Sequence, residues 1–504
     1  MNQIFRYGID KMTVNSALRL LEGQMKGVIS DISRTKIIEN FNAVQSIAKG
    51  DRLVYSINTG FGSLCTTKIS RKETETQQEN LLKSHSVGVG SSIEKEISKL
   101  MLILKVHALC KGFSGISIDV LERICWHIEN GYIPLVPKQG SVGASGDLAP
   151  LAHLSLPLIG LGYLSKDGVS YIASEKVLRD NNMKPLVLHA KEGLALINGT
   201  QFISAFAVKI VDLLKKCLDH ADIIGALTLE SYLGSPQPFV EKLINLRPHR
   251  GSKIVAERMR SFLEDSQLVE SHKECGRVQD PYSIRCIPQV HGASRDALFH
   301  LEQILECELN SVTDNPIVFN KDEAYSGGNF HAQPLALPLD YISFAASEIG
   351  NISDRRIFLL LEGKWGLPQY LIKNAGLNSG FMMVQYVSAA LVSENKSLCF
   401  PASADSIPTG GGQEDHVSMG SISARKALKI VLNLQKILAI ELLCAAQALD
   451  SRRPLKSSKI MEKCHDHIRK TIPHISEDVI LSNHINSAIE IIRSNELSKI
   501  SNSR

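Results

Sequence analysis

The amino-acid sequence predicts a mainly α-helical fold, with an N-terminal domain over residues 1–200 and a bundle of long helices over 201–504. The first reason is that apolar residues beyond residue 200 recur every three or four positions, as on the buried face of a helix. From Ala427 onwards this stripe comprises Ile430, Val431, Leu434, Ile437, Leu438, Leu442 and Ala445. The second reason is composition, because 44% hydrophobic and 21% charged residues are typical of a folded globular chain.

The first 200 residues are expected to be more interrupted than the rest. Short helices are expected at 75–84, 97–111 and 117–129. They alternate with glycine-bearing loops, which are expected at 59–62, 88–90, 139–146 and 198–199. Residues 165–178 can form a short hairpin. The long helices are expected at 201–233, 292–316, 337–363 and 424–449.

The bulk properties of the chain argue against several classes of function. The formal charge of +4 arises from 56 basic and 52 acidic residues, so no surplus points to nucleic acid or to an anionic membrane. The most apolar stretch, 148–164, contains prolines and is short for a membrane span. The first residues carry charges where an export signal needs an apolar run. We therefore expect a soluble, cytoplasmic protein.

The 10 cysteines are scattered without a CxxC pair, so they are expected to be reduced and mostly buried. The run "CHDH", Cys464 to His467, resembles a set of metal ligands. Alternate residues of a helix do not face one another, however, so a solvated helix face is the preferred interpretation. No metal ion is expected.

The segment "QGSVGASGDLAPLAHL" (139–154) concentrates glycine and small residues before an apolar run. A phosphate-binding loop of the Walker A type needs a lysine after its last glycine, and none follows Gly146. A hydrolase nucleophile turn needs the pattern G-x-S-x-G, whereas Gly146 directly follows Ser145. Composition alone favours the start of a helix, with Ser145 or Asp147 as its cap.

A fourth interpretation uses Ala144, Ser145 and Gly146 together. If the backbone bends sharply, the amide nitrogen of Gly146 can attack the carbonyl carbon of Ala144, because glycine has no side chain to block the approach. Loss of one water closes a five-membered ring, and loss of the Ser145 hydroxyl as a second water leaves an exocyclic methylene. The product is a methylidene-imidazolone (MIO), an electrophile of a kind that ordinary side chains do not supply.

Other motifs along the chain support this fourth interpretation. They are "VYSINTGFG" (54–62), "QENLLKSHSVGVG" (78–90), "EGLALINGTQ" (192–201), "QDPYSIRCIPQV" (279–290), "NSVTDNPIV" (310–318), "SGGNFHAQP" (326–334), "GLNSGFMMVQ" (376–385) and "QEDHVSMG" (413–420). Their order is that of the aromatic amino acid ammonia-lyases, which the chain resembles over nearly its whole length. Within this family, the histidine ammonia-lyases are the most similar.

The resemblance implies the removal of ammonia from an aromatic α-amino acid to leave a trans double bond; histidine would give urocanate. It also implies that the MIO from Ala144, Ser145 and Gly146 is the cofactor, with no external one, and that Tyr55 removes the β-proton. A free tyrosine has a pKa near 10, so the site must favour ionisation or couple it to substrate binding. The sequence leaves open whether the methylene takes the substrate amine or the aromatic ring.

The other site residues of the family are carried over one by one. Arg285 matches the partner of the substrate carboxylate, and a guanidinium suits this role because it can bind two oxygens at once. Asn198 and Tyr282 match residues that orient the ring and the reacting amine, and Gln279 matches a further polar contact. Phe330 matches an aromatic wall near the methylene.

Substrate choice is expected to rest on His85 and Glu414. By resemblance, His85 stands where the histidine enzymes carry a histidine, and Glu414 faces the substrate imidazole. A buried carboxylate needs a polar partner, which an imidazole N–H supplies and a phenyl ring does not. Glu414 is the stronger discriminator, because some tyrosine lyases resemble the Ser84–His85 pair as well.

The resemblance further implies an L-aspartase/fumarase-like helical bundle, assembled as a homotetramer whose active sites are shared between subunits and take a small amino acid. A tyrosine ammonia-lyase, an aminomutase or a catalytically silent binding module on the same scaffold stays open. The chain departs from the family at Ser56, at Lys83, in the glycine run 410–412 and at His291, which replaces a common methionine.

Overall fold

The structure is a computed structural model that describes residues 3–50, 53–55, 57–60, 69, 73–274 and 276–502. Its contacts divide the chain into two compact units, each made of separate stretches of sequence. Unit 1 comprises Met1–Lys209, Glu302–Leu339 and Pro401–Arg425, and unit 2 comprises Ile210–Leu301, Asp340–Phe400 and Lys426–Arg504. The units therefore alternate along the chain, whereas the expected boundary at residue 200 separates two continuous stretches.

Unit 1 combines short helices with small sheets. Its helices are α1 (Val14–Leu21), α2 (Asp31–Lys49), α3 (Thr74–His85), α4 (Lys95–Leu109), α5 (Ile118–Asn130), α6 (Leu148–Ser155), α7 (Ser174–Asp180) and α8 (Glu192–Ile197), with 3-10 turns η2 (Leu156–Ile159) and η5 (Gly410–Gly412). The helices expected in the ranges 75–84, 97–111 and 117–129 are confirmed as α3, α4 and α5.

The strands of unit 1 are short and form separate small sheets. Strands β1 (Gln3–Arg6) and β2 (Met25–Val28) pair in parallel, and the other pairings are antiparallel: β3 (Val89–Ser92) with β5 (Pro137–Gln139), β6 (Tyr163–Ser165) with β4 (Ile133–Pro134) and β7 (Ile172–Ala173), and β8 (Ile317–Val318) with β9 (Ala324–Tyr325). The register of β6 and β7 places Leu164 opposite Ile172, so the expected hairpin is present, starting slightly earlier in the sequence.

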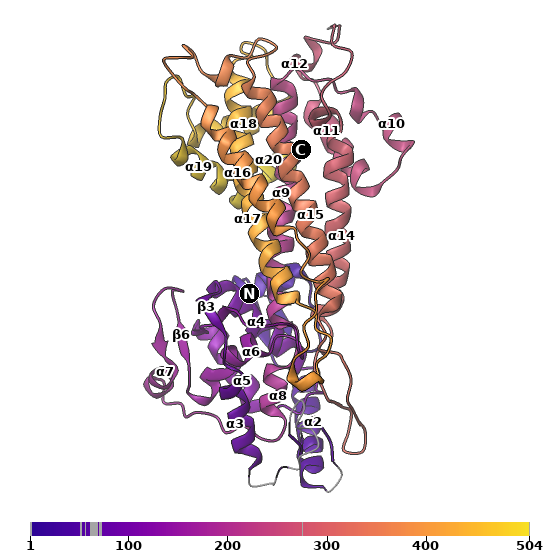
Figure 1. Cartoon of the computed structure of the whole chain (residues 1–504), viewed down its shortest axis with the longest axis vertical. Coiled ribbons are helices and arrows are strands. Elements are labelled where there is room, and N and C mark those ends of the chain that lie inside the picture. The colour runs from indigo at the N-terminus through magenta and orange to yellow at the C-terminus, as the bar shows by residue number, and fades with distance from the viewer. Residues whose placement is uncertain are drawn as a thin grey trace. The chain divides into compact units, whose positions relative to one another are not determined.

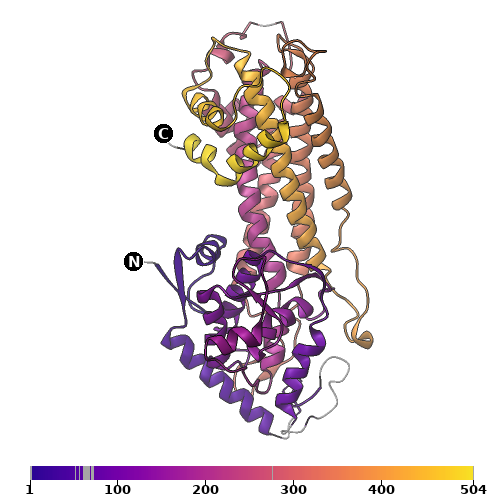
Figure 2. The same ribbon diagram turned by 90° about the vertical axis from the view of Figure 1, so that its left-hand side faces the viewer.

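Unit 2 is built on long helices that run alongside one another (Figures 1 and 2). The long helices that contribute to it are α9 (Gln201–Ser231), α14 (Ile287–Leu309), α15 (Gln333–Leu361), α16 (Met382–Leu398) and α17 (Gly420–Asp450). Its shorter elements are η3 (Gln237–Phe239), α10 (Glu241–Asn245), α11 (Arg250–Leu263), α12 (Gln267–Glu270), α13 (Tyr282–Arg285), η4 (Gln369–Leu371), α18 (Lys459–Thr471), α19 (Leu481–Ser494) and α20 (Glu496–Asn502). The prediction of a mainly α fold is confirmed, as are the long helices α9, α14, α15 and α17, although α14 begins and ends earlier than expected. The sequence did not predict α16.

The apolar stripe read from the sequence forms part of the core of unit 2. Ile430, Leu434, Ile437, Leu438 and Leu442 of α17 are all 0% exposed. Burial of side chains of this size stabilises a fold by roughly 1.5–3 kcal/mol each. Within the described part of the chain, no helix is both long enough and apolar enough to cross a membrane.

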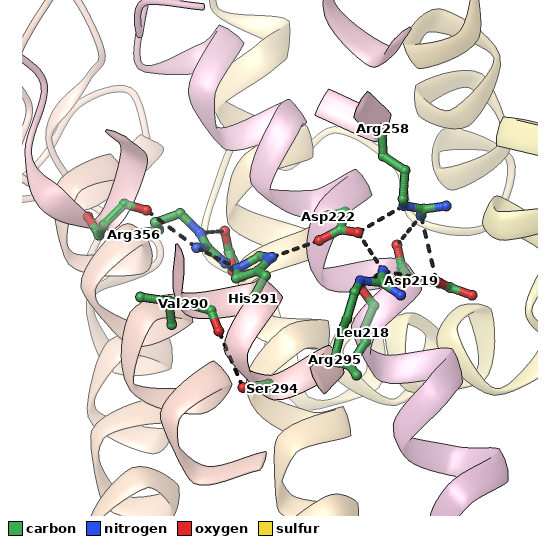
Figure 3. A network of polar contacts seen from close by, with 11 residues as sticks. Leu218, Asp219, Asp222, Arg258, Val290, His291, Ser294, Arg295 and Arg356 are labelled. Carbon is green, nitrogen blue, oxygen red and sulfur yellow. Dashed lines mark hydrogen bonds and ion pairs between the residues drawn. The ribbon is translucent and has the colours of Figure 1, made fainter. Parts of the chain in front are cut away.

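A network of buried charges crosses the interior of unit 2 (Figure 3). The Asp222 carboxylate on α9 accepts from Arg258 at 2.8 Å and from Arg295 at 2.5 Å. It also contacts the Nδ1 atom of His291 at 2.8 Å. His291 is 0% exposed, and its Nε2 atom faces Arg356, which pairs with Glu441 on α17. Buried charges are costly unless they are paired, and here each has a partner.

The "CHDH" run lies on α18, and the expectation of a fully solvated face is wrong for its first residues. Cys464 is 0% exposed and His465 is 4% exposed. The Nε2 atom of His465 lies 2.9 Å from an Asp450 carboxylate oxygen, so these two side chains are in contact within unit 2. Among the described residues, no group of three or more His, Cys, Asp and Glu side chains is arranged to hold a metal ion.

The burial of His291 predicts that unit 2 is sensitive to acid. Burial lowers the pKa of His291 below its usual 6.5, against the hydrogen bond to Asp222, so the unfolded chain takes up a proton at a higher pH than the folded chain does. The contribution of the neutral His291 to the free energy of unfolding is therefore fully present above pH 6.5, and it decreases as the pH falls below 6.5. The other charged groups that face His291 are Arg356 and Glu441.

We expect His291→Gln, which cannot titrate, to flatten the pH dependence of the free energy of unfolding. The measurement is urea denaturation of both proteins at about pH 8 and about pH 5.5. A fall of the same size in both proteins would contradict the assignment of the acid sensitivity to His291.

Candidate active site

The backbone of the loop before α6 is bent in a way that few residues allow. Ser145 has a φ angle of 48°, in the left-handed region that non-glycine residues seldom adopt, and Gly143 and Gly146 have φ angles of 88° and 83°. A Cβ atom on Gly146 would lie 2.1 Å from the carbonyl oxygen of Gly199. Glycine is therefore the residue that fits at position 146.

Backbone hydrogen bonds hold this bend against the residues before α9. The Gly199 N–H donates to the Ser145 carbonyl at 3.2 Å, and the Asp147 N–H donates to the Gly199 carbonyl at 2.8 Å. Gly146 and Gly199 thus form an isolated parallel bridge. The segment "LINGT" can lie this close to the loop because Gly146 has no side chain.

The other side of the loop is held by residues just before and at the start of α17. The Met419 N–H donates to the Val142 carbonyl at 3.0 Å, and the Ser421 hydroxyl donates to the Ser141 carbonyl at 2.7 Å. Ala144 is 9% exposed and forms an apolar cluster with Val417 and Met419. Segments far apart in the sequence therefore clamp the loop from both sides within unit 1.

Asp147 precedes α6, as the sequence predicts, but its side chain does not cap that helix. Its carboxylate instead accepts from the N–H groups of Phe202 and Ile203, at 3.0 and 3.1 Å, at the start of α9. The carboxylate is fully buried, and burial raises the pKa of Asp147 to about 7 despite these hydrogen bonds. The backbone of Asp147 therefore starts α6, while its carboxylate connects the loop to α9.

Sequence reasoning missed Lys105, which lies behind the loop. This α4 residue is 3% exposed, and its Nζ atom donates to the Asn198 carbonyl at 2.5 Å. Burial lowers the pKa of Lys105 to about 7, while the carboxylates of Asp314 and Asp147 favour its charged form. The signal was a lysine within the apolar run "LMLILKVHAL", because a lysine is seldom buried without a polar partner.

The structure brings several of the predicted residues together around one cavity in unit 1. The cavity has a volume of about 780 Å³, and its lining includes Tyr55, His85, Ser145 and Glu414. An adjoining cavity of about 440 Å³ shares Tyr55, Ser145 and Glu414 and adds Phe330. Pockets of several hundred Å³ with a few polar groups are typical of small-molecule sites. The site thus combines residues that the sequence places as far apart as 55 and 414.

His85 and Glu414 are partly buried in the wall of this cavity. The Nδ1 atom of His85 lies 2.9 Å from the Leu81 carbonyl, which leaves Nε2 as the atom for other partners. Burial lowers the pKa of His85, while the hydrogen bond to Leu81 and the negative charge of Glu414 both oppose this shift. The Glu414 carboxylate accepts from the Thr409 hydroxyl at 3.0 Å.

The glycine run before Glu414 has a structural reason. Gly410, Gly411 and Gly412 have φ angles of 57°, 64° and 89°. A Cβ atom on Gly410 would lie 2.5 Å from the Oε2 atom of Glu414. The departure from the family at 410–412 therefore gives a tight turn under the Glu414 carboxylate.

Asn198 is close to the loop, but it does not line either cavity. It is 2% exposed, and its Nδ2 atom donates to the Asn315 carbonyl at 2.9 Å. Its buried Oδ1 atom accepts no hydrogen bond from the described residues. The expected role of Asn198 toward the reacting groups stays a prediction.

The remaining predicted residues, Gln279, Tyr282 and Arg285, belong to unit 2. The Arg285 guanidinium lies 4.4 Å from the centre of the Tyr282 ring, and its Nε atom donates to the Asp280 carbonyl at 3.0 Å. Tyr282 is 70% exposed. Ser56 and residues 61 and 62 of the expected Gly-Phe-Gly turn lie outside the described residues.

Comparison with known proteins agrees with the motifs. The sequence model of the aromatic amino acid lyases matches residues 12–470. The chain belongs to the aromatic amino acid lyase family. The histidine ammonia-lyase of Natranaerobius thermophilus is 45% identical over 467 residues, which cover 92% of each of the two chains. The expectation of a carbon–nitrogen lyase is confirmed.

Solved structures of the family share the fold. The crystal structure of the histidine ammonia-lyase from Trypanosoma cruzi superposes with a TM-score of 0.91 at 40% identity, over 99% of this chain and 95% of that one. The tyrosine aminomutase from Streptomyces globisporus superposes with a TM-score of 0.93 at 33% identity, over 99% and 98% of the two chains. These similarities confirm the expected helical lyase fold.

The close contact between Gly146 and Gly199 predicts a large effect of Gly146→Ala. A matched control is Gly131→Ala, because Gly131 has a similar φ angle of 70° but nothing within 4 Å of an added Cβ atom. Both changes place alanine in the left-handed region, at a cost of about 1–2 kcal/mol. We expect Gly146→Ala to lower the free energy of unfolding by about 2 kcal/mol more, through the clash with the Gly199 carbonyl. If urea denaturation gives the same loss in the free energy of unfolding for both variants, the contact between Gly146 and the Gly199 carbonyl does not constrain the fold.

Proposed function

We propose that the protein is a histidine ammonia-lyase, which converts L-histidine into trans-urocanate and ammonia. The observation that carries the proposal is that Tyr55, His85, Ser145 and Glu414 line one cavity. Relatives with this name support the substrate assignment, since they are 42–46% identical over most of the chain. The alternative on the same scaffold is action on tyrosine, as in the aminomutase from Streptomyces globisporus.

We propose that Ala144, Ser145 and Gly146 form the MIO, with no external cofactor. The loop fits this reaction: Ser145 has a φ angle of 48°, and Gly146 has no room for a side chain. The Gly146 nitrogen attacks the Ala144 carbonyl carbon, and the ring closes with loss of one water. The Ser145 hydroxyl then leaves as a second water, so the reaction releases two waters in all. The MIO supplies an electrophile to which the substrate donates electrons. The buried position of Ala144 against Met419 keeps the first of these residues in place.

Tyr55 is proposed as the base that takes the β-proton of the substrate. It lines both cavities together with Ser145, so a substrate that reaches residue 145 also lies beside the phenol. Phe330 lines the adjoining cavity and would cover one side of the substrate with an aromatic ring. Proton removal by a positioned side chain typically contributes a factor of about 10²–10⁴ to the rate.

Glu414 and His85 are proposed to select histidine. Thr409 and the glycine turn hold the Glu414 carboxylate at the cavity wall, where it can accept the N–H of a substrate imidazole. A phenyl ring would bury this carboxylate without a hydrogen-bond donor, which disfavours phenylalanine as a substrate. His85 adds a polar group with Nε2 available, because its Nδ1 atom already contacts the Leu81 carbonyl.

We further propose a homotetramer in which Gln279, Tyr282 and Arg285 of neighbouring subunits complete each site. Tyr282 is 70% exposed, which suits a residue that acts on another chain. Large apolar side chains are also exposed along α15 and α16 of unit 2, namely Tyr341, Phe344, Phe358, Met383, Tyr386 and Val387. Exposed apolar groups of this extent are typical of interfaces between proteins.

A reducing location fits the sulfur chemistry of the chain. The cysteines 110, 125, 217, 286, 307, 399, 444 and 464 are all free thiols. Burial raises the pKa of Cys125 and Cys464 to about 12, which makes them unreactive. We propose that the enzyme works in the cytoplasm, on a free amino acid and without nucleic acid or membrane as partner.

Formation of the MIO predicts a mass deficit. The intact protein is expected to weigh two waters less than its sequence, and Ser145→Ala is expected to abolish the second dehydration and nearly all activity. Ser141→Ala removes a hydroxyl from the same loop but not the one that is eliminated, so it should keep the deficit. Electrospray mass spectrometry of the three proteins measures this. A wild-type mass equal to that of the unmodified sequence would disprove the proposed cofactor.

The specificity argument predicts that Glu414→Ala lowers kcat/KM for histidine by about 100-fold or more, since the imidazole N–H loses its acceptor. Asp415→Ala, at the exposed neighbouring residue, serves as the control and should change kcat/KM little. Urocanate absorbance measures the rate, and urea denaturation should show similar stability for both variants. Turnover of tyrosine in preference to histidine, or a β-amino acid among the products, would favour the alternative function.

A further inference from the structure

The buried side chain of Arg356 connects the ion network of unit 2 to the helix that carries Tyr282 and Arg285. Arg356 is 0% exposed, and its Nε and Nη2 atoms donate to the Glu441 carboxylate at 2.6 and 2.9 Å. Glu441 also accepts from the hydroxyls of Thr228 and Ser353, at 2.8 and 2.6 Å. This paired geometry fixes the plane of the guanidinium, because its fork is rigid.

The third nitrogen of the fork, Nη1, points away from Glu441. It lies 3.3 Å from the Nε2 atom of His291 and 3.4 Å from the Ser283 carbonyl oxygen. Arginine can only donate, so the Nε2 atom of His291 must accept, and its Nδ1–H then donates to Asp222. Figure 3 shows His291 between Arg356 and Asp222.

His291 must be neutral in this arrangement. A protonated His291 would turn a second N–H toward the Arg356 guanidinium, where a donor would face a donor. Burial lowers the pKa of His291, which agrees with the neutral form. His291 thus orients Nη1 without adding a charge, and Asp222 keeps its ion pairs with Arg258 and Arg295.

Ser283 lies in α13 between Tyr282 and Arg285. This helix spans only Tyr282–Arg285, so its backbone depends on outside partners for its position. Asp280, just before α13, accepts from the Ser235 N–H at 2.6 Å, and the Asp280 carbonyl accepts from Arg285. The contact from Arg356 to the Ser283 carbonyl is buried, whereas the neighbouring Tyr282 is 70% exposed.

We propose that Arg356, oriented by Glu441 and His291, is a positioning residue for the substrate-carboxylate site on α13. It does not touch the substrate; it fixes the Ser283 backbone and through it the direction of Arg285 and Tyr282. The inference rests on the proposed function, in which Arg285 binds the carboxylate of histidine. A displacement of about 1 Å at such a group can cost up to 100-fold in rate.

The test compares ligands with and without a carboxylate. Arg356→Lys keeps a positive charge near Glu441, but a single ammonium cannot replace the fork that also reaches Ser283 and His291. We expect this variant to raise KM for histidine about tenfold, with a smaller change in kcat. We also expect inhibition by imidazole propanoate, which has the carboxylate, to weaken about tenfold, and inhibition by histamine, which lacks it, to stay within about twofold.

The matched control is Thr228→Val, which removes a hydrogen bond to the same Glu441 carboxylate without touching Arg356 or Ser283. It should leave the affinity for both inhibitors unchanged while lowering stability, which thermal unfolding measures. Should Arg356→Lys fail to fold, His291→Leu tests the same point, because it removes the acceptor that orients Nη1. In His291→Leu, the affinity for the carboxylate-bearing inhibitor should fall again, by a smaller factor. In His291→Gln, which keeps a donor and an acceptor, this affinity should return to the wild-type value.

The outcomes separate the inference from the function on which it rests. If the wild-type protein does not turn over histidine, the proposed function fails and the inference fails with it. If the wild type is active but the folded variants lose affinity for both inhibitors equally, or for neither, the positioning role of Arg356 alone is wrong. Selective loss of the carboxylate-bearing inhibitor supports the role, since general destabilisation would not distinguish the two ligands.

Discussion

The close approach of Gly146 to Gly199 is the contact on which the rest of the site depends. It requires glycine at position 146 and holds Ser145 in the left-handed region by backbone hydrogen bonds. It also places Asp147 where its carboxylate binds the first N–H groups of α9. The loop that we propose to react with itself is therefore part of the junction between α6 and α9. Its strained conformation persists because rigid elements on both sides determine it.

Buried ionisable groups organise both units, in different ways. In unit 1, burial brings the pKa values of Lys105 and Asp147 to about 7, so both groups are partly neutral near this pH. In unit 2, Asp222 and Glu441 are each paired with arginines, and the histidine among them is neutral. Replacing one member of a buried pair typically costs about 3–5 kcal/mol. Such groups specify one arrangement of the helices, because other arrangements would leave a charge unpaired.

Much of the fold and part of the site could be predicted from the sequence. Periodicity located α9, α15 and α17 to within about four residues, but it placed α14 too late in the sequence and missed α16. The motifs identified Tyr55, His85, Ser145, Phe330 and Glu414, which share adjoining cavities. Periodicity is local, so it could not show that unit 1 recruits 302–339 and 401–425. For the same reason it missed the Asp147 carboxylate as a cap for α9, the burial of His465, and Lys105 as a partner of Asn198. Each of these depends on a neighbour distant in sequence.

The clamp on the loop has a consequence for the order of events in the cell. The Ser421 hydroxyl that binds the Ser141 carbonyl is 280 residues further along the chain, and Met419 and Val417 cover the loop from the same distant segment. A ribosome makes roughly 5–20 residues per second, so the loop is outside the ribosome for many seconds before its clamp exists. Until then the contacts that Val417, Met419 and Ser421 make with the loop cannot form. If the loop reacts as we propose, formation of the MIO has to wait until most of the polypeptide has been made.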